Sequence, residues 1–263
     1  MTTPSPLFIV GSPRSGTSTL VEACLAAGLA GYREGNLLTL VKPVLDQVEH
    51  HFRIFGKAGP KTLIGTIPVE RMRTAVLDVF KREVDERNPV SPWFDKTCNP
   101  AMIYALPDLI RLWPECRILF AKRRGIENVL SRLVKFPHLN FETHCRDWAA
   151  NMAAWREIRV RLEVWRFLEV EQRELVTRPD GVAAGIAGLL ELGDAAQTRI
   201  EAVIRSGRNQ ETAPGTAERV IDLQDTGWSA SQIDVFLRSC GPEMAQFGYS
   251  NSADYFLVTQ GAG

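Results

Sequence analysis

The sequence lacks the charge and hydropathy patterns of several large protein classes. Its 31 Lys and Arg residues balance 31 Asp and Glu residues, so no net charge draws the molecule toward nucleic acid or an anionic membrane. The apolar run Leu7 to Val10 is too short for a membrane helix or a signal peptide, and no basic stretch precedes it. We therefore expect a cytoplasmic protein with no membrane or nucleic-acid partner, in which anions are bound locally.

Patterns typical of metal sites and disulfides are also missing. The five cysteines are odd in number, widely spaced and without a Cys-x-x-Cys pair, which favours reduced thiols over disulfides or structural zinc. Of the four histidines, His50 and His51 are adjacent and would point to different faces of a helix. We expect no metal to be required.

Short apolar strands alternate with amphipathic helices along the chain. Strands are predicted at 7–10, 93–96, 116–122 and 167–170, and helices at 15–29, 36–55, 69–87, 141–166 and 229–239. This alternation is typical of parallel βαβ units. The sequence therefore predicts one α/β domain over residues 1–263, with three layers: a central, mostly parallel sheet flanked by helices. We expect the helices at 36–55 and 69–87 to cover this sheet.

The loop from Gly11 to Thr19 joins the first strand to a helix. Unpaired backbone N–H groups and the positive end of the helix dipole converge at such a turn, which suits an anion, and glycines let the backbone approach it. The spacing fits the P-loop pattern G-x-x-x-x-G-K-[ST], but Thr17 stands at the lysine position. The loop's cation is instead Arg14, whose guanidinium can hold the oxygens of a group in transit.

Residues 13–19, Pro-Arg-Ser-Gly-Thr-Ser-Thr, resemble the 5′-phosphosulfate loop of sulfotransferases that use 3′-phosphoadenosine 5′-phosphosulfate (PAPS). The resemblance implies a P-loop-like fold, PAPS as cofactor, 3′,5′-ADP as product and no metal. Arg14 would stabilise the oxygen that bridges phosphate and sulfate. The 5′-phosphate would be bound by Ser15, Gly16, Thr17, Ser18 and Thr19. An ordinary strand-to-helix turn with a surface arginine is the alternative.

A second basic turn follows the predicted strand at 116–122. Arg123 stands at the strand end and Ser131 follows eight residues later, a spacing that resembles the 3′-phosphate site of the same family. Taken alone, the turn would be interpreted as a solvated basic patch. A loop that closes over the 3′-phosphate is expected at 206–215, through backbone N–H groups and Arg208, although a surface loop fits equally well.

Sulfuryl transfer requires a group that takes the acceptor's proton. Residues 95–98, Asp-Lys-Thr-Cys, resemble the Lys-Thr-His stretch of many cytosolic members, but Cys98 replaces the histidine and is expected to be a small buried residue. The branch that acts on sugars and tyrosine uses a glutamate after the first helix, and Glu34 is similar in placement. We expect Glu34 as the base and Lys96 at the transferring sulfate. Alternatively, Glu34 lies in the capping region of the next helix and Lys96 ends an edge strand.

The predicted function is sulfuryl transfer from PAPS to a hydroxyl or amine of a small-molecule or glycan-like acceptor; a homodimer is left open. Aromatic residues on the predicted helices would line the acceptor pocket or belong to the core: Phe52, Phe55, Trp148 and Trp155. One alternative is a P-loop small-molecule kinase, against which Thr17 speaks because such enzymes need the loop lysine and magnesium. The other is an inactive nucleotide-binding protein, suggested by the missing histidine and by residues 172–175, which depart from the family's Tyr-Glu-Asp-Leu.

Overall fold

A single parallel sheet organises the protein. The structure is a computed structural model, and it describes residues 5–89, 92–206 and 220–257. The strands run in the order β2-β3-β1-β4-β5, and every neighbouring pair is parallel. Their bounds are β1 Pro6–Gly11, β2 Ala30–Tyr32, β3 Trp93–Lys96, β4 Arg117–Lys122 and β5 Phe167–Glu171. The carboxyl ends of the strands therefore meet at one edge of the sheet, with the first strand at its centre.

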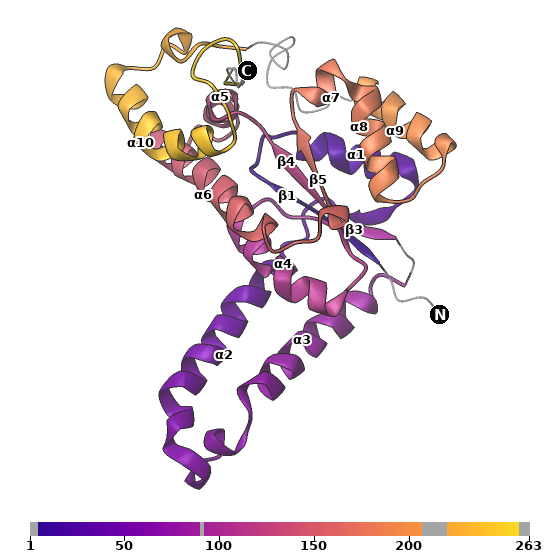
Figure 1. Ribbon diagram of the computed structural model, residues 1–263, viewed down its shortest axis with the longest axis vertical. Helices are drawn as coiled ribbons and strands as arrows, with labels where there is room; N and C mark the ends of the chain where they lie inside the picture. Colours follow the sequence, from indigo (N-terminus) through magenta and orange to yellow (C-terminus); the bar gives the residue numbers. More distant parts are fainter. Residues whose placement is uncertain (1–4, 90–91, 207–219, 258–263) are drawn as a thin grey trace, which may run out of the picture.

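Helices cover both faces of this sheet, which confirms the predicted three-layer α/β fold (Figure 1). One face carries α4 (Pro100–Leu112) and α6 (Phe141–Arg159), with α10 (Ala230–Gln246) packed on α6. The other carries α1 (Thr17–Ala27), α8 (Pro179–Leu189) and α9 (Asp194–Ser206). Two short helices, α5 (Gly125–Lys135) and α7 (Glu174–Thr177), follow β4 and β5 at the carboxyl edge.

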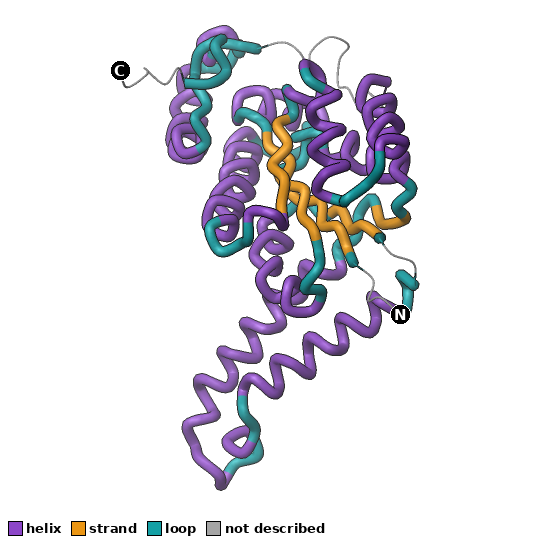
Figure 2. The backbone as a smooth tube through the Cα atoms, turned by 45° about the vertical axis from the view of Figure 1, so that its right-hand side comes forward, coloured by secondary structure: helices purple, strands orange, loops and turns teal. Residues whose placement is uncertain are grey.

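The two layers of core follow from the period of two along each strand. All six residues of β1 are buried; Phe8 and Val10 face the α4/α6 side, whereas Leu7 and Ile9 face the α1/α8 side. Figure 2 shows the strands, in orange, enclosed between helices. Because both faces are covered, β1 reads as a continuous apolar run in the sequence, as is usual for a parallel sheet.

The helices at 36–55 and 69–87 do not cover the sheet, and that expectation was wrong. After the 3₁₀ turn Leu37–Leu40, α2 (Val41–Phe55) and α3 (Val69–Asp85) form a hairpin that extends away from the sheet (Figures 1 and 2). Their amphipathic stripes face each other and α4 near the hairpin base, where Leu45 and Leu77 are buried. Arg73 of α3 pairs with Glu49 of α2 and Asp108 of α4, which braces this base.

Other differences from the predicted elements are small. The predicted helix 141–166 ends at Arg159, and a separate 3₁₀ turn spans Val164–Arg166. Strand β2 was not predicted because it has three residues, Ala-Gly-Tyr, all exposed at the sheet edge. Trp148 and Trp155 belong to the core, whereas Phe55 is exposed near the end of the hairpin. Arg208 lies outside the described residues.

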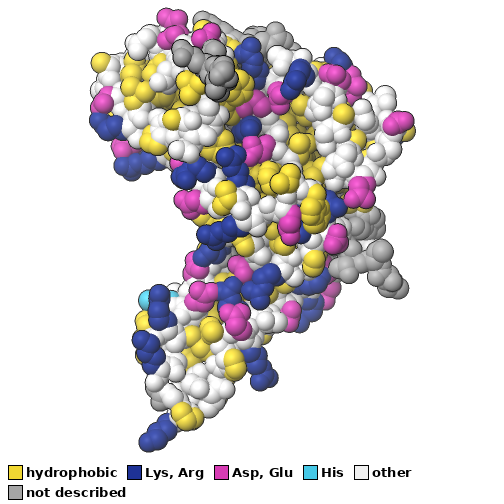
Figure 3. Space-filling view, viewed as in Figure 1, with side chains coloured by type: hydrophobic (Ala, Val, Ile, Leu, Met, Phe, Trp, Pro, Cys, Tyr) yellow, Lys and Arg dark blue, Asp and Glu magenta, His cyan; other side chains and the backbone are white. Residues whose placement is uncertain are grey.

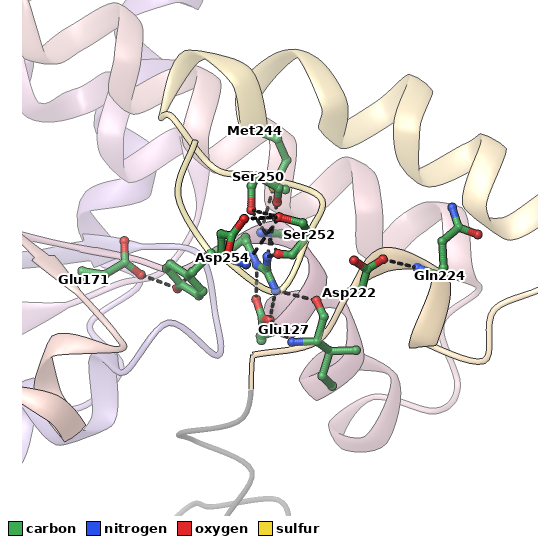
Figure 4. Close-up of polar contacts among 12 residues, drawn as sticks. Glu127, Glu171, Asp222, Gln224, Met244, Ser250, Ser252 and Asp254 are labelled. Atoms are coloured by element: carbon green, nitrogen blue, oxygen red, sulfur yellow. Dashed lines mark hydrogen bonds and ion pairs between the residues drawn. The ribbon is translucent and has the colours of Figure 1, made fainter. Parts of the chain in front are cut away.

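The C-terminal segment 220–257 is attached to the carboxyl edge of the sheet by a buried arginine, Arg124. In Figure 4, Ser250 and Ser252 of this segment lie near Glu127. Arg124, at the start of α5, is fully buried and forms an ion pair with Glu127. Its guanidinium also donates to the carbonyl oxygens of Ile221 at 2.6 Å, Ser250 at 3.3 Å and Ser252 at 2.5 Å. A buried charge with this many partners is fully compensated, so Arg124 fixes the segment in place.

Glu171 makes the second attachment of the same segment. Its buried carboxyl accepts hydrogen bonds from the hydroxyls of Tyr249 at 2.6 Å and Tyr255 at 2.7 Å. Tyr255 in turn accepts from the backbone N–H of Arg124 at 3.2 Å. Burial raises the pKa of the Glu171 carboxyl to about 7, although both tyrosine hydroxyls favour its charged form.

The stability of the fold should therefore depend on the Glu171 proton. A glutamate in the unfolded chain releases this proton near pH 4.5, so between about pH 4.5 and pH 7 the folded state binds more protons and its stability falls as pH rises. Glu171→Gln keeps the neutral shape and should flatten this decline. Urea unfolding at pH 5, 6, 7 and 8 measures it, with the exposed Glu191→Gln as control; an unchanged slope in Glu171→Gln would contradict the assignment.

Candidate functional site

The candidate site lies at the carboxyl ends of β1, β3 and β4, where the loop at residues 12–16 leaves the sheet. Gly11, at φ 138°, has no room for a side chain because a Cβ there would overlap the carbonyl of Ala121 in β4. Arg14 and Gly16 have φ values of 73° and 90°, both in the left-handed region. Strained backbone at a non-glycine residue such as Arg14 is often found at binding sites.

The loop ends at the N-terminus of α1, which has no side chain to cap it. Gly16 is the N-cap residue, and Thr17, Ser18 and Thr19 form the first turn. The backbone N–H groups of this turn and the helix dipole therefore favour an anion at the loop. The structure thus places the five residues predicted from the sequence, 15–19, in the loop and the first helical turn, around one point.

Arg14, Arg123 and Ser131 come together although they are far apart in the sequence. The Nε atom of Arg14 donates to Ser131 Oγ at 3.0 Å, and Arg123 Nη1 donates to the Arg14 carbonyl oxygen at 3.2 Å. Arg14 therefore lies between the end of β4 and helix α5, and it contacts both Arg123 and Ser131, the two residues that the eight-residue spacing had linked. Burial, followed by the charge of Arg123, lowers the pKa of the Arg14 guanidinium, as expected where two cations converge.

The Nε–H group of Arg123 is buried and has no hydrogen-bond acceptor among the described residues. Buried donors are almost always paired, and burial lowers the pKa of this guanidinium because its charge is costly there. A phosphate or sulfate oxygen would supply the missing acceptor and a compensating negative charge.

Asn128 is a site residue that sequence analysis missed. It is fully buried on α5, and its Nδ2 atom donates to the Pro13 carbonyl and to Ser15 Oγ, both at 3.0 Å. These bonds hold the loop against α5 and orient the Ser15 hydroxyl. The only signal in the sequence is a polar residue between apolar Ile126 and Val129, on what is otherwise the buried face of the helix.

Glu34 and Lys96 also meet at this edge, on the β3 side of the loop. Lys96 ends β3, and its ammonium forms an ion pair with the Glu34 carboxylate. The Glu34 side chain is 61% exposed and the Lys96 side chain 9%, so the pair joins a buried cation to a carboxylate open to solvent. The backbone N–H of Gly35 donates to the Lys96 carbonyl at 3.2 Å, which ties the two segments together.

Asp95 is the second residue that the sequence did not reveal. Its buried carboxyl accepts from Thr97 Oγ1 at 2.7 Å, and that hydroxyl accepts from the backbone N–H of Asn36 at 3.0 Å. Burial raises the pKa of Asp95 to about 6, and the negative charge of Glu34 adds to this effect. Asp95 therefore holds the segment that carries Glu34 in two ways. It binds the Thr97 hydroxyl, which binds the backbone of Asn36, and its carboxyl packs against Gly35.

Cys98, at the position of the family histidine, is half-buried and not fully buried as expected, and it is a poor base. Burial raises the pKa of its thiol, whereas a general base at neutral pH would need a lowered one. The carboxylate that pairs with Lys96 at this edge is that of Glu34, and it is exposed.

Comparison with known proteins identifies the family. The model of the sulfotransferase family matches residues 6–195, which include the turns after β1 and β4, Glu34 and Lys96. The chain belongs to the sulfotransferase family. No protein with a curated description matches it.

Solved structures of other sulfotransferases share this sulfotransferase's fold. The sulfotransferase domain of the Synechococcus PCC 7002 olefin synthase is 18% identical, with a TM-score of 0.56 over 95% of this chain and 97% of that one. Sulfotransferase STF9 from Mycobacterium avium is 12% identical, with a TM-score of 0.55 over 94% and 76%. Mouse sulfotransferase SULT7A1, solved in complex with PAP, is 14% identical, with a TM-score of 0.54 over 94% and 89%.

The described residues of this sulfotransferase contain neither a candidate membrane span nor a candidate metal cluster. In the part of the chain that the structure describes, no helix has the length and apolarity needed to cross a membrane. Within the same residues, His, Cys, Asp and Glu side chains form no group of three or more that could hold a metal ion.

Replacing Gly35 should disturb the sulfotransferase site. A Cβ there would overlap the Asp95 carboxyl, so Gly35→Ala must push the Glu34 segment away from β3. We expect a loss of about 1–3 kcal/mol in unfolding free energy, as for other overpacked sites. Gly188→Ala, in α8 with open space around its Cα, is the matched control and should be neutral or slightly stabilising. Urea unfolding compares the two; equal stability would show that the segment is not held against Asp95.

Proposed function

We propose that this sulfotransferase transfers the sulfuryl group of PAPS to a hydroxyl or amine of a small-molecule or glycan-like acceptor. The observation that carries the proposal is the arrangement of Arg14 between Arg123 and Ser131, which joins the loop after β1 to a second anion-binding turn after β4. One ligand with two separated phosphate groups would fit two such turns. The complex of the mouse neighbour with PAP, which is 3′,5′-ADP, supports this choice of donor.

The donor's two phosphates would occupy the two turns. The 5′-phosphate would be bound by residues 15–19, with the dipole of α1 behind them. The 3′-phosphate would accept from the leftover Nε donor of Arg123 and from Ser131. Asn128 would hold the loop against α5, because its uncharged amide donates a hydrogen bond to the loop backbone.

The transfer itself needs a proton acceptor and a cation near the sulfuryl group. PAPS supplies an activated sulfuryl group; the acceptor oxygen or nitrogen forms a bond to sulfur while the bond to the bridging oxygen breaks. Glu34 would accept the acceptor's proton, and Lys96 and Arg14 would offset the negative charge that grows on the leaving oxygen. The exposure of the Glu34 carboxylate leaves room for an acceptor beside it.

Membership of the sulfotransferase family favours sulfuryl transfer over the kinase alternative. The position of the P-loop lysine is Thr17, a buried residue, so the loop offers no cation to a γ-phosphate there. An inactive protein of the same fold would bind the nucleotide and transfer nothing, which the two experiments below distinguish.

Nucleotide binding should require both phosphates and no magnesium. In a thermal-shift assay with EDTA, 3′,5′-ADP should raise Tm strongly, while 5′-AMP and ATP raise it little. Arg123→Ala should weaken 3′,5′-ADP at least about 10-fold more than it weakens 5′-AMP, because the lost contact with the Arg14 carbonyl affects both nucleotides, whereas the lost charged hydrogen bond to the 3′-phosphate affects 3′,5′-ADP alone. The exposed Arg199→Ala is the control. A preference for magnesium-ATP would overturn the proposal.

Transfer should require the Glu34 carboxylate while binding should not. Glu34→Gln keeps the shape of the side chain but cannot accept the proton, so we expect 3′,5′-ADP to bind normally and the transfer rate to fall by about 10²-fold or more. Glu22→Gln, which breaks the ion pair between Glu22 and Arg33, serves as control. The readout is transfer of the ³⁵S-labelled sulfuryl group from PAPS to a panel of phenols, sugars and amines, with 3′,5′-ADP as the other product. An unimpaired rate in Glu34→Gln would remove it from the mechanism.

A further inference from the structure

The end of the α2/α3 hairpin exposes large apolar side chains. We call residues 50–68, from the last turns of α2 to the start of α3, the hairpin tip. Three of its apolar residues are exposed: Ile54 and Phe55 by 51% each and Leu63 by 80%. Single exposed apolar residues are common, but three at one end of a protrusion call for a partner that covers them.

The hairpin tip is also basic. It contains Arg53, Lys57 and Lys61, and no acidic residue stands between Glu49 and Glu70 in the sequence. The whole chain has equal numbers of basic and acidic residues, so the rest of the molecule carries a net charge of −3. The balanced total, from which we expected no membrane partner, therefore conceals a separation of charge between the hairpin tip and the remainder.

The hairpin tip is placed to touch a flat surface. It forms one end of the molecule along its longest axis (Figure 1), and the space-filling view shows basic and apolar side chains together at that end (Figure 3). Each helix of the hairpin adds about 1.5 Å per residue, so α2 alone holds the tip about 20 Å from its own start. A plane can contact the tip without meeting the bulkier α/β body.

We propose that the hairpin tip docks the protein on an anionic lipid bilayer. Apolar side chains beside lysine and arginine are the composition that binds the headgroup region, where the apolar groups enter the acyl boundary and the cations meet acidic lipids. The negative remainder is repelled by the same surface, which orients the molecule with its hairpin tip down. This inference does not depend on the sulfuryl-transfer proposal.

Two other occupants fit less well. A second copy of the tip would bring three cations against three cations, which the apolar area of a few side chains would not offset. A protein partner would need an acidic, concave site to receive the tip, because the tip is the turn of a hairpin and not a groove. A bilayer needs no such shape, since its surface adapts to a convex end.

The loop that follows α6 offers a matched comparison on the same chain. It exposes Val160, Val164 and Trp165, but its charges are of both signs, and Glu163 pairs with Arg166. Exposed apolar residues are therefore present at both places, but residues 160–166 carry a net charge of only +1, from Arg161 and Arg166 against Glu163, whereas the hairpin tip carries +3 with no acidic residue. This loop should not bind vesicles.

Vesicle sedimentation of the full-length protein tests the proposal. The probes are vesicles of phosphatidylcholine alone and of phosphatidylcholine with 30% phosphatidylserine. We expect binding to the anionic vesicles only, weakened by 0.5 M NaCl. Lys57→Gln with Lys61→Gln should reduce the partition constant by about 30-fold, at about 1 kcal/mol for each cation near the surface. Ile54→Ser with Leu63→Ser should also reduce it, and Val160→Ser with Val164→Ser should leave it unchanged.

A tryptophan introduced at the tip separates this binding from nonspecific adsorption. None of the six native tryptophans lies in residues 50–68, so Phe55→Trp adds a reporter there. Brominated lipids should quench its fluorescence when anionic vesicles are added, with less effect on the native protein. Equal binding to neutral vesicles, equal loss in the loop control, or a concentration-dependent dimer abolished by Ile54→Ser with Leu63→Ser would overturn the proposal. Circular dichroism confirms that each variant is folded.

Discussion

The docking of the loop at residues 12–16 on the start of α5 is the contact on which the arrangement of the site depends. Asn128 binds the loop from α5, and Arg123 binds its backbone from the end of β4, so two segments more than 100 residues apart become one surface. Parallel strands make this possible because they deliver both turns to the same edge. Gly11 allows β1 and β4 to lie close together where the two turns begin, since any side chain there would force the strands apart.

The β3 side of the site is held together differently, by the buried carboxyl of Asp95 next to the ion pair between Lys96 and the exposed Glu34. Asp95 is held in a position where burial favours its neutral form, and it supports the Glu34 segment through Thr97 and the space left by Gly35. Lys96 is buried from the same strand and points its charge at Glu34. Burying Asp95 and Lys96 costs free energy, and both buried groups lie where they hold the exposed Glu34 carboxylate in place.

Sequence patterns could predict the parts of the site that follow from local geometry. A strand, a glycine-rich turn and a helix locate the loop around Arg14, and the eight-residue interval links Arg123 to Ser131. Asn128 and Asp95 could not be predicted, because each stands beside another polar residue, Glu127 or Lys96, and no period or spacing shows which of the two faces the site. The direction of the hairpin was also out of reach, since an amphipathic stripe shows that a helix has a partner and does not say whether that partner is a sheet or another helix.

Arg123 and Arg124 show that hydrogen-bond partners, and not residue type, distinguish the proposed binding residue from a structural one. They are adjacent and identical in the sequence, and both follow β4. The guanidinium of Arg124 is saturated by Glu127 and three carbonyl oxygens, so it has nothing to offer a ligand and instead fixes the C-terminal segment. Arg123 keeps a buried donor without an acceptor among the described residues. An unpaired buried donor is costly, so Arg123 gains from an anionic ligand a compensation that Arg124 already has within the fold.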